Sequence, residues 1–353
     1  MRFRRAAALA ATFQGGEIVI NNFLTQDRFT CSPECLRFLS ALDDWHRDRE
    51  LFRYFPESDR AGVAEQVAEL VGMNALVVEG TPRADEDELY RREWLWGATA
   101  GLFHFSVRNT RFIVGTPARR FIRKRKAWKP SPALYQTNRG MKKTFGLPET
   151  DLTKEPFALM RKRRSRRNFD GKPIRLEALA DCLFAGNGIV EFIEDKDYGR
   201  LPLSMTPSGG ARNPFELYVY ANKVAGLKTG FYHYSALDHD LGLVRAGQAD
   251  VKRMLAGQLW PARASALVFL VVHFPRTMWK YHLPMAYRIV MMEAGFISQN
   301  IVLAATAHGL SAVPSGALKE SLIEGYLGTP PLESAVVFSV SLGKARGRGQ
   351  PAL

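Results

Sequence analysis

A basic segment that also carries a hydroxyl is the first feature of this sequence that could do chemistry. Residues 163–170 read Arg-Arg-Ser-Arg-Arg-Asn-Phe-Asp and follow a stretch with helical character. The guanidinium groups of Arg163, Arg164 and Arg167, with the Ser165 hydroxyl, can surround a phosphate with charge-assisted hydrogen bonds. A solvated basic surface or a nucleic-acid-binding patch would have the same composition, so the segment alone leaves all three interpretations open.

Three later segments have a chemistry suited to a flat ring. The run 207–214 (Pro-Ser-Gly-Gly-Ala-Arg-Asn-Pro) precedes a predicted strand, 314–316 (Pro-Ser-Gly) follows a long predicted helix, and 343–344 (Gly-Lys) ends the last predicted strand. Glycine lets a ring approach main-chain N–H groups closely, and the lysine adds a further cation. With the basic segment, this ordered set resembles the FMN-binding nitroreductase family over residues 151–346.

The resemblance implies a set of contacts to FMN. In that family the Arg-x-Ser-x-Arg element holds the flavin phosphate and pyrimidine edge, and the Pro-Ser…Asn element lies beside the isoalloxazine ring. Gly316 would offer its N–H near flavin N5, and Lys344 would reach the phosphate. Fixed cations suit the cofactor because reduced flavin carries negative charge near N1. The implied FMN-binding residues are Arg163, Arg164, Ser165, Arg167, Pro207, Ser208, Gly209, Asn213, Ser315, Gly316 and Lys344.

A polar pair after a predicted core strand narrows the resemblance. Trp279-Lys280-Tyr281, followed by Tyr287-Arg288 and the run 293–300, resembles the SagB-type azoline dehydrogenases, which make thiazoles and oxazoles in ribosomal peptides. The resemblance implies that Lys280 and Tyr281 are catalytic; taken alone, the dipeptide would be a polar loop. The N-terminal segments that resemble the same branch are the Glu17 strand, Trp94/Trp96, Phe103-His104, Ala133-Leu134-Tyr135 and Leu147-Pro148.

Oxidation of an azoline ring requires a base. Aromatising an azoline removes one hydride and one proton, so a proton acceptor must lie near the substrate carbon. Either Lys280 or Tyr281 can take the proton, and the sequence does not determine which. Tyr287 and Glu293 are expected to pack or to orient neighbours. The histidines and cysteines show no metal-ligand spacing, so no metal is expected.

The elements that position these residues predict an α+β fold of the nitroreductase type. Residues 266–274 and 335–342 are continuous apolar runs, typical of strands buried on both faces. Between them, residues 287–308 carry an apolar stripe with helical spacing, and Gly309 follows as a stop signal. Further elements are predicted as helices near 157–161 and 176–184 and as a strand at 216–221.

The first 85 residues predict a winged-helix-like domain. Strands at 17–24 and 74–79 enclose two helical patterns, the first opened by Ser32 and Pro33. Such a scaffold can bind DNA or hold a peptide against its strands. The second helical pattern carries Glu65 and Glu69 and almost no basic residue, so we do not expect a nucleic-acid partner. The predicted domains are 1–85 for peptide or partner recognition, 86–150 as a helical connector, and 151–346 for FMN.

Composition limits the remaining choices. The chain has 353 residues, enough for two domains, and a net charge of +14, which favours anionic partners. A second basic run lies at 119–129. No stretch approaches 18 uninterrupted apolar residues, which predicts no membrane-spanning helix. The signal-like start, residues 1–14, runs on into a predicted strand and is interpreted as part of the fold. Three cysteines do not make a disulfide framework and favour a reducing cytoplasm.

The resemblance to the nitroreductase family implies a homodimer in which two protomers share each FMN site, and a cytoplasmic location is expected. The expected substrate is a leader-bearing precursor peptide with azoline rings, oxygen is the expected final electron acceptor, and a cyclodehydratase is the expected partner of the N-terminal domain. Two alternatives stay open. One is a general NAD(P)H-dependent nitro or quinone reductase, and the other is a basic winged-helix binding protein with a vestigial flavin fold.

Overall fold

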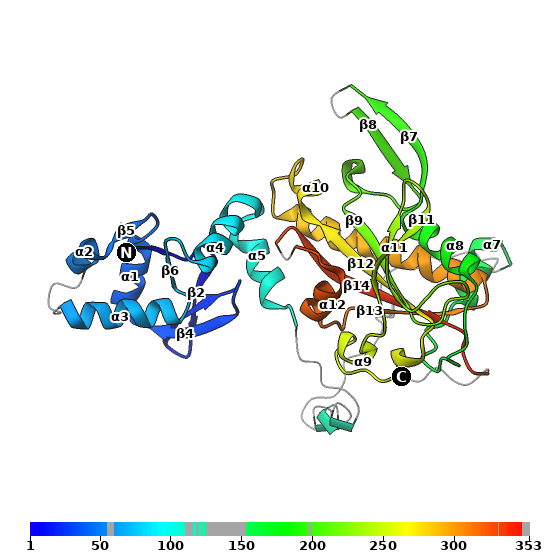
Figure 1. Cartoon of the computed structure of the whole chain (residues 1–353), viewed down its shortest axis with the longest axis horizontal. Coiled ribbons are helices and arrows are strands. Elements are labelled where there is room, and N and C mark those ends of the chain that lie inside the picture. The colour runs from blue at the N-terminus through cyan, green and yellow to red at the C-terminus, as the bar shows by residue number, and fades with distance from the viewer. Residues whose placement is uncertain are drawn as a thin grey trace, which may run out of the picture.

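The structure is a computed structural model that describes residues 1–54, 60–109, 116–117, 120–121, 123–124, 153–196, 199–330 and 332–347. Figure 1 shows an N-terminal module, residues 1–93, joined through a short helix to a larger C-terminal domain, residues 153–347. The predicted segments that lie largely or wholly outside the described residues are the basic run 119–129, Ala133-Leu134-Tyr135 and Leu147-Pro148.

The N-terminal module contains two small antiparallel sheets and four α-helices. One sheet has the order β5-β1-β6 and the other the order β2-β3-β4. The strands are β1 (Arg2–Arg5), β2 (Leu9–Gln14), β3 (Glu17–Asn22), β4 (Asp27–Cys31), β5 (His46–Arg47) and β6 (Leu76–Val78). The helices are α1 (Pro33–Ala41), α2 (Asp48–Leu51), the 3₁₀ turn η1 (Phe52–Tyr54), α3 (Arg60–Gly72) and α4 (Pro82–Glu93).

The strands and helices expected in this module are present as β3, α1, α3 and β6. Ser32 caps α1 by accepting a hydrogen bond from Cys35 N, as its position before Pro33 predicts. The returning strand β6 pairs with β1 and not with β3. The signal-like start is therefore part of the fold, because residues 2–14 form β1 and β2. Contacts with β1 continue past residue 85, since Arg4 forms ion pairs with Asp87 and Glu88 on α4.

The C-terminal domain is built on a six-stranded antiparallel sheet with the order β11-β10-β9-β12-β14-β13. Helices cover both faces: α8 and α11 lie on one side, and α9 and α12 on the other. The strands are β7 (Ile189–Asp195), β8 (Gly199–Ser204), β9 (Phe215–Ala221), β10 (Gly230–Ser235), β11 (Asp240–Ala246), β12 (Ala266–His273), β13 (Ser311–Ser315) and β14 (Ser334–Gly343). The helices are α7 (Glu155–Lys162), α8 (Leu176–Asn187), η2 (Gly209–Ala211), α9 (Val251–Met254), η3 (Trp260–Arg263), α10 (Phe274–Met278), α11 (Met285–Ala307) and α12 (Glu320–Leu327).

The central strands confirm the expectation of burial on both faces. In β12, Val268 and Leu270 join the core under α11, whereas Leu267 and Phe269 join the core under α9 and α12. Successive side chains of a strand point to opposite faces, so a strand with helices on both sides must be apolar throughout. The α+β architecture predicted from the sequence is therefore confirmed.

The long helix α11 matches the predicted stripe and ends before Gly309, whose φ is 66°. It is long and apolar enough, by length and composition alone, to cross a membrane, although the sequence showed no uninterrupted apolar run of that length. Its inner face, including Val290, Ile297 and Ile301, is buried against α8 and the sheet. We interpret α11 as the core helix of this domain, whose apolar content follows from that packing.

No sequence pattern predicts the hairpin β7–β8, which projects from the C-terminal domain in Figure 1. Residues 190–195 of β7 are all exposed, so no face of this strand required an apolar pattern. The hairpin leads directly into the loop 205–214, which makes it part of the surroundings of the candidate site.

Candidate functional site

The arginine segment, residues 163–167, lies along one end of the large sheet. It starts where α7 ends, and the backbone of Arg166 exchanges two hydrogen bonds with the Ser311 hydroxyl, of 3.1 and 2.9 Å. Phe169 then pairs with Ala345, and Asp170 N donates to Lys344 O at 2.8 Å. The fold thereby brings Lys344 to the end of the arginine segment, although more than a hundred residues separate them in sequence.

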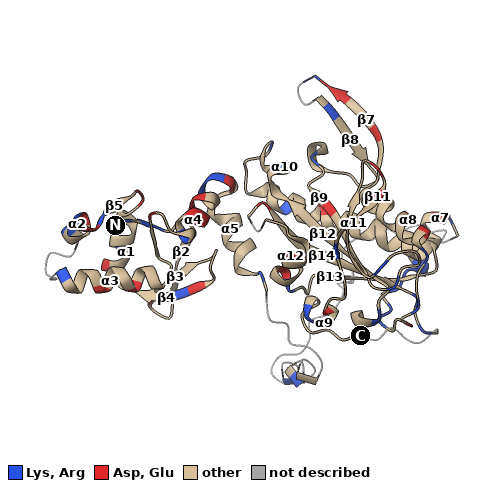
Figure 2. Cartoon of the chain, in the orientation of Figure 1, with Lys and Arg blue, Asp and Glu red and all other residues tan. Residues whose placement is uncertain are grey.

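The cations here fit an anionic ligand. Arg163 donates to the Ser165 hydroxyl at 3.5 Å, and the Arg167 guanidinium lies 5.8 Å from the Trp260 ring centre. Among the residues that the structure describes, neither Arg163 nor Lys344 forms an ion pair. Figure 2 shows Lys and Arg gathered at this end of the domain. Clustered cations without internal counter-charges are the donor set that a phosphate group requires.

The loop 207–213, by contrast, is held by a buried acid on α11. Glu293 accepts hydrogen bonds from the Ser208 hydroxyl at 2.9 Å and from Gly209 N at 2.8 Å. The same Ser208 oxygen accepts from Asn213 N at 2.9 Å, which closes the loop on itself. Burial raises the pKa of Glu293, and these two hydrogen bonds act in the opposite direction. Ser208 and Asn213 therefore shape the loop, and Pro207 begins it at the exposed surface.

Lys280 and Tyr281 lie against this loop, just after α10. Gly210 has a φ of 63°, and a Cβ at this position would collide with the Tyr281 hydroxyl and lie 3.0 Å from Lys280 Nζ. The Lys280 Nζ atom is 5.6 Å from the Tyr281 ring centre. Glycine therefore adopts this positive φ without strain and leaves room for the ends of both side chains. We call Lys280, Tyr281 and the loop 207–213 the lysine–tyrosine site.

The N-terminal half of the chain supports the lysine–tyrosine site directly. Helix α5 (Gly97–Ser106) is preceded by Trp96, which is fully buried and donates from Nε1 to the carbonyl oxygen of Tyr281 at 2.9 Å. His104 on α5 is hydrogen-bonded through Nδ1 to the Tyr287 hydroxyl at 2.9 Å. Burial lowers the pKa of His104 to about 3 and raises that of Tyr287 to about 12, so both stay neutral at ordinary pH.

These supporting residues carried only a partial signal in the sequence. Glu293 is a lone acid on the buried stripe of α11, between Val290 and Ile297, and such a residue must find hydrogen-bond donors. Glu293 and Tyr287 were expected to pack or to orient neighbours, and both are hydrogen-bonded to a neighbour, Glu293 to Gly209 and Tyr287 to His104. The bond from Trp96 to Tyr281 spans 185 residues and had no local signal.

Ser315 and Gly316 lie between these two groups. Ser315 ends β13, and its carbonyl oxygen accepts a hydrogen bond from the Ser339 hydroxyl. Gly316 lines a cavity of about 270 Å³ together with His104, Tyr287 and Met291. In the described part of the chain, the N–H of Gly316 makes no hydrogen bond, so it is available to a ligand.

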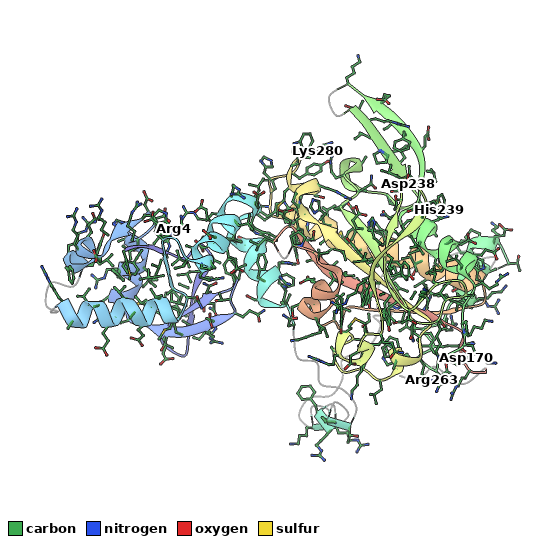
Figure 3. All side chains as sticks on the ribbon, viewed as in Figure 1. Arg4, Asp170, Asp238, His239, Arg263 and Lys280 are labelled. Carbon is green, nitrogen blue, oxygen red and sulfur yellow. The ribbon has the colours of Figure 1, made fainter. Side chains whose placement is uncertain are left out.

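One chain does not bring the arginine segment and the lysine–tyrosine site together. Lys344 follows the C-terminal end of β14, whereas Ser334 at its other end pairs with His273, which leads into α10 and Lys280. The 10 residues of β14 span on the order of 30 Å. Figure 3 shows Lys280 and Asp170, which follows the arginine segment, at opposite ends of the domain. Within one chain, the two groups are therefore too far apart to contact the same ring.

The described residues contain no group of three or more histidine, cysteine, aspartate or glutamate side chains that could hold a metal ion. Cys31, Cys35 and Cys182 are present as thiols. The arrangement offers cations for a phosphate, a main-chain donor at Gly316 and a proton acceptor at Lys280 or Tyr281. This combination suits a phosphorylated redox cofactor better than a metal.

Comparisons with known proteins find nitroreductases among the relatives of this chain. The sequence model described as the nitroreductase family matches residues 160–344. A protein described as a nitroreductase from Methanocaldococcus jannaschii is 30% identical over 183 residues, which cover 51% of this chain and 87% of that protein. The trifolitoxin-processing protein TfxB of Rhizobium leguminosarum bv. trifolii is 35% identical over 137 residues, and this match covers 37% of each chain.

A solved structure with a similar arrangement is the Escherichia coli microcin synthetase McbBCD complex with truncated pro-MccB17 bound. The aligned chain is 17% identical, with a TM-score of 0.46, and the alignment covers 67% of this chain and 84% of that one. This chain spans well under half the length of TfxB.

Proposed function

The chain belongs to the nitroreductase family, and from that premise we propose that it is an FMN-dependent dehydrogenase that oxidises azoline rings of a ribosomally made peptide to thiazoles or oxazoles. The observation that carries the proposal is the packing of Lys280 and Tyr281 against Gly210, next to the loop that in this family lies beside the flavin ring. The relationship to a trifolitoxin-processing protein supports a peptide as the substrate.

The residues at both ends of the domain fit FMN. Arg163, Arg167 and Lys344 would hold the phosphate, because two of these cations have no ion pair among the described residues. Gly316 would donate its N–H to the ring, and the loop that Glu293 holds through Ser208 and Gly209 would lie beside it. FMN, when bound, supplies the hydride acceptor.

The remaining half of the reaction belongs to Lys280 and Tyr281. Conversion of an azoline to an azole removes one hydride and one proton, so one of these side chains takes the proton. The bond from Trp96 fixes the backbone of Tyr281, and Gly210 leaves room for the hydroxyl. We propose that the two electrons pass finally to oxygen.

A homodimer would complete the site, because the two groups of residues are separated within one chain. The outer face of α11 supports this state: Met285, Ile289, Met292 and Phe296 repeat at intervals of four, three and four residues and are all exposed. An apolar stripe of this kind on a surface helix is typical of a helix that packs against another protein surface. Ile289 also lies close to Gly209, which places the stripe beside the lysine–tyrosine site.

The N-terminal module offers a place for the precursor peptide or a cyclodehydratase. A groove of about 400 Å³ lies between β4, α1 and α3, lined by Phe29, Phe38, Glu69 and Met73 among others. Strand β4 is at the edge of its sheet, and an extended peptide can add to such an edge as a further strand. We propose that this groove binds the leader or the partner.

Mass spectrometry of an azoline-containing peptide incubated with the purified protein tests the proposal. We expect a loss of about two mass units per ring, since each oxidation removes one hydride and one proton. Lys280→Ala and Tyr281→Phe should each slow this loss by on the order of a hundredfold or more and keep the yellow colour of bound flavin. A general nitro or quinone reductase would be indifferent to both substitutions, and a colourless protein would indicate the vestigial fold.

A further inference from the structure

A second cavity lies directly beside the lysine–tyrosine site. Its volume is about 460 Å³, and it is bounded by the base of the β7–β8 hairpin, by β10 and by α10. Leu201, Phe215 and Leu237 form an apolar part of the wall. Residues 211–213 line the cavity and also belong to the loop that passes Lys280 and Tyr281. The cavity therefore adjoins the lysine–tyrosine site.

The polar part of this wall is cationic. Glu216 is the one carboxylate among the described residues that line the cavity, and it is already engaged. Arg276 donates a hydrogen bond to it, and His233 Nε2 lies 2.8 Å from its other oxygen. Burial raises the pKa of Glu216, but these contacts outweigh burial and leave it below its usual range. The carboxylate is therefore charged and paired. Arg212 adds positive charge to the wall, and Arg200, which also lines it, lies 4.0 Å from Glu194.

The Arg212 side chain is held by stacking on an aromatic ring, but it has no anionic partner in the described part of the chain. Its guanidinium lies 4.9 Å from the ring centre of Trp279, the residue before Lys280. Its Nε atom is buried and has no hydrogen-bond partner among the described residues. A buried donor without a partner is costly, and a stacked guanidinium presents its remaining N–H groups in a fixed plane. The fixed plane of the guanidinium suits a carboxylate that arrives with a ligand, whereas the buried Nε atom itself is closed to solvent in this conformation.

We propose that this cavity binds the part of the peptide next to the azoline ring, and that Arg212 binds a carboxylate in that part. The inference rests on the proposed function and names a substrate preference for the same site. The carboxylate can belong to an acidic side chain or to the C-terminus of the peptide. Apolar residues on either side of it would contact Leu201 and Phe215. Arg212 is thus a specificity-determining residue.

Binding of product-like peptides tests this without any turnover. Three short synthetic peptides that carry a thiazole differ only near the ring: one has Glu and an amidated C-terminus, one has Gln and an amide, and one has Gln and a free C-terminal carboxylate. Calorimetry with the FMN-loaded protein should give a Kd for at least one acidic peptide on the order of tenfold lower than for the neutral one. The acidic peptide that binds more tightly identifies the source of the carboxylate.

Arg212→Gln should abolish that preference and leave the Kd of the neutral peptide nearly unchanged. Arg212→Lys should keep part of it, because the charge remains but the planar fork is lost. The matched control is Arg245→Gln, since Arg245 on β11 also stacks on an aromatic ring, 5.0 Å from the centre of Tyr326, but is not among the residues that line the cavity. This control should retain the full preference.

The inference is overturned if the three peptides bind equally or not at all, or if Arg212→Gln keeps the preference. It is also overturned if Arg212→Gln loses its flavin absorbance, because Arg212 would then serve FMN. The proposed function can fail separately. If the protein prefers acidic peptides but never removes two mass units from an azoline, the carboxylate site at Arg212 stands and the azoline dehydrogenase activity is refuted.

Discussion

The arginine segment and the lysine–tyrosine site are built in opposite ways. Around Lys280 and Tyr281, buried groups hold each other: Glu293 holds the loop 207–213, and Trp96 holds the backbone of Tyr281. At the arginine segment the backbone is fixed to β13 and β14, but Arg163 has no ion pair among the described residues. The hydrogen bonds that hold the first region are thus formed without a ligand, whereas the second region includes Arg163, whose charge has no ion-pair partner among the described residues.

This difference indicates where each region obtains its stability. Buried hydrogen bonds contribute to folding whether or not a cofactor is present. Clustered cations repel one another until an anion binds, so their contribution appears as ligand affinity. Substitutions in the two regions should therefore change different measured quantities.

The largest effect on stability is expected at Glu293. Glu293→Leu removes the acceptor for the Ser208 hydroxyl and for Gly209 N, and each unsatisfied buried donor costs about 1–3 kcal/mol. The free energy of unfolding of the FMN-free protein should fall by about 2–4 kcal/mol, measured by denaturant titration. Glu293→Gln keeps the shape and one acceptor and should lose clearly less. Equal losses for both variants would contradict this role of the carboxylate.

At the arginine segment the effect should appear in FMN binding. Arg163→Ala should raise the Kd for FMN by about ten- to a hundredfold. This factor corresponds to the free energy of one charge-assisted hydrogen bond. The stability of the FMN-free protein should hardly change. Flavin fluorescence titration measures the first quantity and thermal unfolding the second. Arg175→Ala, which removes an exposed arginine paired with Glu177, is the control and should bind FMN normally.

A smaller effect on stability is expected when the pH is lowered, because His104 is buried behind the lysine–tyrosine site. The pKa of His104 is about 3 in the fold and 6.5 in an unfolded chain. Because the folded value is depressed, the unfolded chain takes up the proton first as the pH falls below 6.5, and stability is lost between that pH and about 3. Between pH 7 and 5.5 this histidine should contribute a loss of about 1 kcal/mol.

His104→Phe should remove that part of the pH dependence. The measurement is the free energy of unfolding of both proteins across this pH range. His282→Gln replaces an exposed histidine and should leave the dependence as it is in the original chain. A parallel decline for the original chain and for His104→Phe would show that another group titrates.

The sequence predicts some elements of this fold because their physical cause is local. The continuous apolar runs of β12 and β14 and the stripe of α11 reflect burial along one element, so periodicity reveals them. The exposed hairpin β7–β8 has no such pattern, and β13 is short and contains Pro314. At the site, residue types alone suggested the arginine segment as one possible phosphate site, and the family resemblance pointed to Lys280 and Ser208. The bond from Trp96 to Tyr281 depends on tertiary packing, which periodicity does not encode.

The separation of the two regions also determines which residues each protomer would contribute to a site in the proposed dimer. If each FMN lies between two protomers, the arginine segment of one chain serves the lysine–tyrosine site of the other. A variant that lacks Arg163 and Lys344 and a variant that lacks Lys280 would each be inactive alone. Mixed chains would combine one intact set from each protomer at one of the two sites.

Subunit complementation therefore tests the central claim most directly. Arg163→Ala/Lys344→Ala and Lys280→Ala proteins are unfolded and refolded together at equal amounts, and azoline oxidation is measured by mass loss. Half of the random dimers are mixed and each has one complete site of two, so we predict about a quarter of the original activity. A mixture no more active than its separate components would show that the two regions do not meet across a dimer.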